Sequence, residues 1–144
     1  MEGLEEISQK IHDEPKNLAY LVEGVTLYHM IVEATLGLAS QRTVLTRVRR
    51  SGLYPGFQQG FMATCCDESR HVLFGVKFLR EIVAKDPTYA EIIHNTIARW
   101  MPQIRATLHL TLMASAGNDS DDGVTFGITS LRKKLRVIGV DSNI

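Results

Sequence analysis

The chain is organised around one short stretch, Cys66-Asp67-Glu68-Ser69-Arg70-His71, which is read together with Glu33. A helix is predicted from about residue 56 to residue 85. Glu68 and His71 are three residues apart in it, so both side chains leave the same face of the helix about one turn apart. A carboxylate and an imidazole in this arrangement can bind one metal ion.

The Glu-x-x-His spacing is also the building block of a known type of metal centre. In the carboxylate-bridged two-metal centres of ferritin-like helical bundles, two helices each supply a Glu-x-x-His pair and two others each supply a Glu. Glu68 and His71 form one such pair, and Glu33 on the preceding helix is the additional carboxylate. The sequence therefore predicts half of a di-metal site.

The spacing of these residues predicts that they meet. In an antiparallel helical hairpin, residues at the same height are equally far from the turn. The midpoint between Glu33 and His71 is Gly52, which lies in the helix-breaking segment Ser51-Gly52-Leu53-Tyr54-Pro55-Gly56. We therefore expect Glu33, Glu68 and His71 at one level of the hairpin.

A second Glu-x-x-His pair, Glu91 with His94, is not expected to join this site. It lies about four to seven residues after the helix break at Asp86-Pro87, whereas His71 lies about fifteen residues before it. On antiparallel helices that rise about 1.5 Å per residue, the two motifs are more than about 10 Å apart along the axis.

Composition predicts one domain, residues 1–144, with a substantial core, because 44% of the 144 residues are hydrophobic. Sixteen basic and sixteen acidic residues give a net charge of zero. No overall field therefore attracts nucleic acid or an anionic membrane.

Features of the chain also predict its compartment. The acidic N-terminus lacks the basic-then-apolar order of a signal peptide. No transmembrane helix is expected, since Glu23, His29 and Glu33 interrupt the most apolar run. The side chains of the adjacent cysteines Cys65 and Cys66 diverge on a helix, and a reduced, cytoplasmic chain is the simplest interpretation.

The hydrophobic pattern predicts an all-α fold. Helices are expected at residues 3–12, about 18–49, about 56–85, 88–116 and 129–137. Asn17 and Asp86 are the expected N-caps, and Pro102 predicts a kink near Arg99. The polar, glycine-containing segment 117–123 is predicted to be a loop before the short last helix.

Several segments together resemble a known family. They are Tyr28-His29-Met30-Ile31-Val32-Glu33, Leu53-Tyr54-Pro55-Gly56-Phe57, Asp67-Glu68-Ser69-Arg70-His71-Val72-Leu73-Phe74-Gly75-Val76-Lys77-Phe78-Leu79, Asp86-Pro87, Tyr89 and Leu135-Arg136-Val137-Ile138-Gly139. The chain resembles the C-terminal half of the ligand-binding oxidases related to the ribonucleotide reductase small subunit. The resemblance covers nearly the whole chain.

This resemblance implies a ferritin-like bundle that binds a manganese/iron or di-iron pair, activates dioxygen there and holds a long-chain fatty acid beside it. By position, Glu33, Glu68 and His71 would be the metal ligands. Tyr28 would be the tyrosine that this family crosslinks oxidatively to a valine. Asp67 resembles an aspartate that accepts a hydrogen bond from a metal-bound histidine.

The family's N-terminal half, with its own Glu, Glu-x-x-His and valine, has no counterpart in this sequence. A split gene, a truncated product and a half-length relative all fit this pattern. Homodimerisation would supply four carboxylates and two imidazoles, which is the full ligand set, and a partner chain carrying the other half would do the same.

Two functional classes remain open on the sequence. One is a di-metal oxidase of the reductase-small-subunit-like type, completed as a dimer. The other is a non-catalytic helical module that keeps half of the metal site. A reductase small subunit proper is less favoured, because no radical-transfer or subunit-docking segment is recognisable.

Overall fold

The computed structural model describes residues 2–116, 120–141 and 143, and every element in that part of the chain is a helix. The helices are α1 (Glu2–Asp13), α2 (Leu18–Val25), the π-helix η1 (Thr26–Gly37), α3 (Leu38–Ser51), α4 (Pro55–Lys85), α5 (Tyr89–Ala116) and α6 (Ser120–Ile138). The predicted all-α fold is confirmed.

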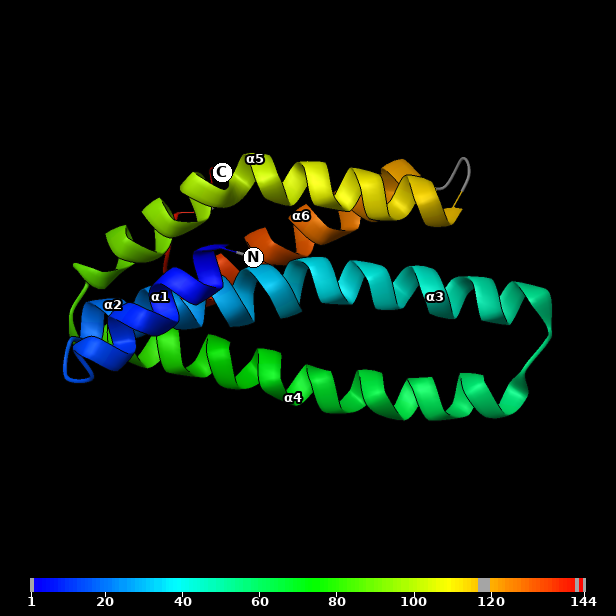
Figure 1. Cartoon of the computed structure of the whole chain (residues 1–144), viewed down its shortest axis with the longest axis horizontal. Coiled ribbons are helices and arrows are strands. Elements are labelled where there is room, and N and C mark those ends of the chain that lie inside the picture. Colours follow the sequence, from blue (N-terminus) through cyan, green and yellow to red (C-terminus); the bar gives the residue numbers. More distant parts are fainter. Residues whose placement is uncertain (1, 117–119, 142, 144) are drawn as a thin grey trace.

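The predicted hairpin forms the long axis of the molecule. Because α2, η1 and α3 follow one another without a break, they make a single rod that runs antiparallel to α4 (Figure 1). Gly52 ends α3 with a left-handed φ of 65°, a conformation that costs glycine little. The turn therefore lies at the midpoint that the sequence indicates.

The other helices complete the bundle around this hairpin. α5 runs along the rod on the side away from α4, α6 lies between α5 and the hairpin, and α1 covers the N-terminal end (Figure 1). Their contacts bury one core, whose largest fully buried apolar side chains are Met30, Leu79, Ile93, Ile97, Ile104, Leu108, Leu131, Leu135 and Ile138. α5 also changes direction part-way along its length, as Pro102 within it predicts (Figure 1).

The C-terminal segment differs from the prediction. α6 begins at Ser120, so residues 120–123 of the predicted loop are helical, and the last helix is longer than 129–137; residues 117–119 lie outside the described part. Gly127, which weakens the helical signal in the sequence, lies where a Cβ would be 3.2 Å from Leu108 Cδ1 and 3.4 Å from the Thr35 carbonyl oxygen. Close packing accounts for this glycine.

The rod Leu18–Ser51 passes a length-and-composition test for a membrane span, with mean hydropathy 1.2, and it alone does so within the described ranges. Half of that apolar window is buried inside the structure. Met30, Ile31 and Ala34 belong to the core, which explains its apolar character without a membrane. The absence of membrane insertion stays a prediction.

Candidate metal centre

Glu33 lies in the one π-helical segment described in this chain. Its backbone carbonyl accepts the N–H of Leu38, five residues on, and the Thr35 hydroxyl donates to the Met30 carbonyl, also five residues away. A plain α-helix was predicted for this region, and apolar spacing carried no signal for the wider turn. π-helical turns are rare and are frequent at functional sites.

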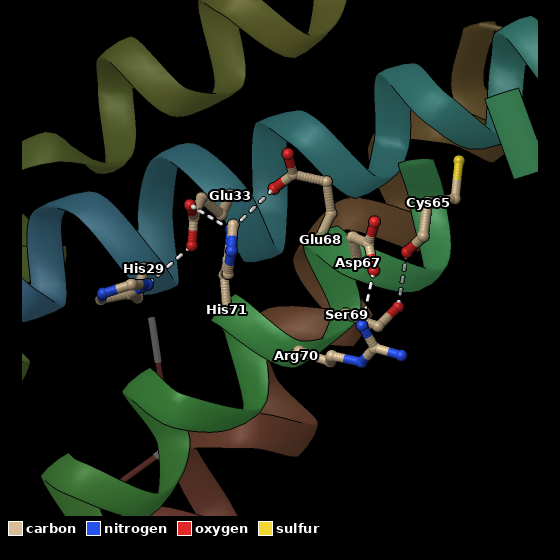
Figure 2. Close-up of polar contacts among 8 residues, drawn as sticks. All are labelled: His29, Glu33, Cys65, Asp67, Glu68, Ser69, Arg70 and His71. Atoms are coloured by element: carbon tan, nitrogen blue, oxygen red, sulfur yellow. Dashed lines mark hydrogen bonds and ion pairs between the residues drawn. The ribbon is translucent and has the colours of Figure 1, made fainter. Parts of the chain in front are cut away.

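The hairpin brings the three predicted ligands together. His71 Nδ1 on α4 lies 3.6 Å from Glu33 Oε1 on η1 and 3.6 Å from Glu68 Oε2 (Figure 2). One donor atom from each of the three residues lies within 4.8 Å of the others, the only such group of three or more found in the described residues. The expectation that these residues share one level of the hairpin agrees with this geometry.

The three side chains fit a first-row metal ion. Carboxylate and imidazole donors suit manganese and iron. At metal–ligand distances of about 2.1 Å, as in zinc sites, two donors lie at most about 4.2 Å apart. The distances of 3.6 Å from His71 Nδ1 to Glu33 Oε1 and to Glu68 Oε2 already fall within that limit. Only the two carboxylates would need a small adjustment to bind the same ion.

The group is buried at one end and open at the other. The side chain of Glu33 is 7% exposed, that of Glu68 is 34% exposed and that of His71 is 58% exposed. A buried carboxylate is costly unless it is compensated, so Glu33 needs its polar neighbours. The open end at His71 leaves room for further ligands from another chain.

Tyr28 packs against His29, which contacts Glu33, and it is partly exposed. The oxidation of Tyr28 that the resemblance implies stays a prediction. The negative charge of Glu33 raises the pKa of Tyr28 above its usual value, and burial, a hydrogen bond from its hydroxyl to Glu33 and the charge of Glu68 act in the same direction. The neutral phenol is therefore the favoured form next to the two carboxylates.

Asp67 does not face an imidazole in this structure. It accepts a hydrogen bond from Arg70 Nη1 at 2.6 Å, on the exposed side of α4 (Figure 2). The role that the resemblance implies for Asp67 stays a prediction. Arg70 is thus an exposed residue that forms a salt bridge with Asp67.

His29 is the neighbour that sequence reasoning missed. Its Nδ1 lies 2.6 Å from Glu33 Oε2, within the π-helical segment (Figure 2). The signal was present as the four-residue spacing between His29 and Glu33 on one helix face. It was passed over because an isolated histidine is usually just a polar residue of the core or the surface.

An apolar groove of about 170 Å³ lies between α1, η1 and α5. Its lining includes Leu4, Leu27, Ile31, Trp100 and Ile104. Ile31 is two residues from Glu33, so its side chain leaves the helix on nearly the opposite side. The groove therefore does not open into the Glu33–Glu68–His71 group.

No protein-family model matches the sequence, and a search of curated proteins finds no match. Solved structures do match. Two are R2-like ligand-binding oxidase variants with Mn/Fe cofactors, one reconstituted anaerobically (TM-score 0.85) and one aerobically (TM-score 0.84). A third variant holds a non-activated Mn/Mn cofactor, with a TM-score of 0.85. Each is 23% identical to this chain and covers 99% of it.

The chain has the fold of the R2-like ligand-binding oxidases. It spans 51% of the length of these three structures. The predicted resemblance to half of such an oxidase is thus confirmed at the level of the fold. About half of each of these oxidase chains therefore has no counterpart in this chain.

Proposed function

We propose that this chain is a di-metal carboxylate protein of the ribonucleotide-reductase-small-subunit-like oxidase type, which activates dioxygen for a two-electron oxidation. The observation that carries the proposal is the convergence of Glu33, Glu68 and His71, whose donor atoms lie within 4.8 Å of one another. The solved structures with the same fold hold Mn/Fe or Mn/Mn cofactors, which supports manganese and iron as the metals.

Completion of the site by a second copy of the chain is part of the proposal. Three protein ligands are half of the set found in di-metal carboxylate bundles, and two copies supply the whole set about a two-fold axis. Phe74 is exposed on α4, on the same face as His71, and Tyr28 is exposed on η1. Such apolar side chains around an open polar site favour burial against a partner.

Within the completed site, a metal pair would supply the redox equivalents for dioxygen reduction. The residues of this chain would hold and orient it: Glu33 from the buried side, and Glu68 and His71 from α4. Tyr28, which packs against His29 and whose pKa is raised by the charge of Glu33, is the side chain of this chain proposed to be oxidised. A bound long-chain fatty acid remains a prediction from the resemblance.

The cytoplasmic location is likewise proposed. It is supported by Cys65 and Cys66, which are both free thiols.

The proposal is tested by loading the metal-free chain with Mn(II) and Fe(II) and measuring bound metal together with the melting temperature. Metal that binds the folded state raises its stability. We expect Glu68→Gln to lose both the bound metal and the metal-dependent rise in melting temperature.

Glu91→Gln is the matched control, since Glu91 belongs to the other Glu-x-x-His pair and is exposed on α5. It should behave as the unaltered chain does. An unchanged metal-dependent melting temperature in Glu68→Gln would contradict the proposal.

A non-catalytic helical module is the second candidate, and the match to only 51% of the oxidase chains favours it. Stoichiometry separates the two. About two metal ions per dimer support the oxidase, and a chain that never binds metal supports the module.

A further inference from the structure

The two carboxylate oxygens of Glu33 have different partners. Oε2 lies 2.6 Å from His29 Nδ1, whereas Oε1 lies 3.6 Å from His71 Nδ1 on α4. A carboxylate oxygen can only accept, so the His29 ring N–H donates the short bond. The bond fixes one oxygen against η1 and leaves the other facing the α4 ligands (Figure 2).

The surroundings of His29 hold its ring in one place. Its side chain is only 16% exposed, and its ring packs edge-on against Phe74, with ring centroids 5.5 Å apart, and against Tyr28, with ring centroids 5.0 Å apart. These contacts come from both helices of the hairpin. The ring is thus limited by packing as well as by its bond to Glu33.

Gly75 on α4 provides the space for this ring. A Cβ at position 75 would lie 2.8 Å from His29 Cγ and 3.1 Å from Met30 Cε. Contacts this close force neighbouring atoms to move. The absence of a side chain at Gly75 therefore lets α4 approach η1 at the height of His29, one turn from His71.

We propose that His29 is a positioning residue of the metal centre, which holds Glu33 by a hydrogen bond so that the free oxygen of Glu33 faces Glu68 and His71. This inference rests on the proposed metal site. Groups that orient a metal ligand in this way typically change metal affinity by about 10–100-fold when removed. The resemblance to the oxidases gave no role to His29.

The test compares two substitutions that separate the hydrogen bond from the ring. His29→Phe keeps an aromatic ring beside Phe74 and Tyr28 but has no donor. His29→Asn loses the ring but places an amide N–H near the position of Nδ1. His94→Leu, on α5, is the control for the loss of a histidine elsewhere in the chain. His29→Leu is a second variant without a donor, for use if the larger ring of Phe prevents folding.

Mn(II) affinity is measured by the electron paramagnetic resonance signal of the free ion during titration, with circular dichroism to check folding. We expect about 10–100-fold weaker binding in His29→Phe and His29→Leu, most of the affinity restored in His29→Asn, and no change in His94→Leu.

Equal affinity in the unaltered chain and in both donor-free variants would overturn the inference and leave the metal site standing. Equal loss in His29→Phe and His29→Asn would also overturn it, because the donor would then not be the feature that matters. A chain that binds no Mn(II) before any substitution would instead refute the proposed function, and the inference with it.

Discussion

The burial of Glu33 affects both the stability of the chain and its proposed metal site. It is a nearly buried carboxylate among core residues, and it is compensated by His29 on its own helix and by His71 across the hairpin. An unpaired carboxylate there would be costly. The same arrangement that makes its burial tolerable turns one oxygen toward His71, where the proposed metal ion would bind.

Tyr28 should be oxidised when the proposed site reacts with dioxygen. Aerobic reconstitution with Mn(II) and Fe(II) is expected to give a visible absorption band or a change in protein mass, because Tyr28 lies beside His29 and close enough to Glu33 for the charge of Glu33 to raise its pKa. Tyr28→Phe should lose that signal while it still binds metal. Identical spectra and masses for the two proteins would remove Tyr28 from the chemistry.

The titration of Lys134 should make the stability of the folded chain depend on pH. Burial, and then the charge of Lys133, lower the pKa of Lys134 in the folded chain. The folded state therefore binds fewer protons than the unfolded state, and stability rises with pH through the lowered pKa up to the ordinary lysine value of about 10.4.

Lys134→Met removes this titration. Compared with the unaltered chain, its stability advantage should be largest near pH 7 and should shrink as the pH approaches about 10. Denaturant unfolding at several pH values measures it, with the exposed Lys85→Met on α4 as the control. An advantage that grows with pH would contradict the account.

At the scale of elements, the contact between η1 and α4 is the critical one. Gly75→Ala should reduce the free energy of unfolding by about 1–3 kcal/mol, the usual cost of overpacking, because the new methyl group meets His29 and Met30. It should also weaken metal binding, since it displaces His29. Gly60→Ala on α4, where a Cβ meets nothing, is the control.

Chemical denaturation and metal titration of Gly75→Ala and Gly60→Ala measure both effects. Equal stability of the two variants would show that α4 and η1 are not closely packed at position 75.

The elements also show what the sequence could and could not predict. The hairpin and the meeting of its ligands were predictable because breaks at Gly52 and Pro55 fix where two long helices reverse. The π-helical turn was not, since apolar spacing does not distinguish a locally wider turn. The start of α6 was missed because the polar, glycine-containing segment 117–123 was predicted to be a loop, whereas Ser120 already begins the helix.

The proposed metal site of the whole molecule is complete only with a partner. The matched oxidase chains are about twice as long as this chain, and Phe74 is exposed on the same face of α4 as His71. If a second copy covers this surface, Phe74→Asp should shift a dimer to monomer and abolish metal loading while the helices persist, because a charge cannot be buried there without cost.

Analytical ultracentrifugation and circular dichroism of Phe74→Asp measure this effect. Leu110→Asp is the control, since Leu110 is also exposed but lies on α5, on the far side of the rod from α4 (Figure 1). A Phe74→Asp protein that stays dimeric and metal-loaded would exclude this surface as the interface.

If three ligands in each chain build a di-metal centre between two chains, native mass spectrometry with metal analysis of the same sample should detect it. We expect a dimer that carries about two manganese or iron ions in the unaltered chain, and no bound metal in Glu68→Gln. A metal-free monomer, or a dimer that keeps its metal when Glu68 is replaced, would contradict it.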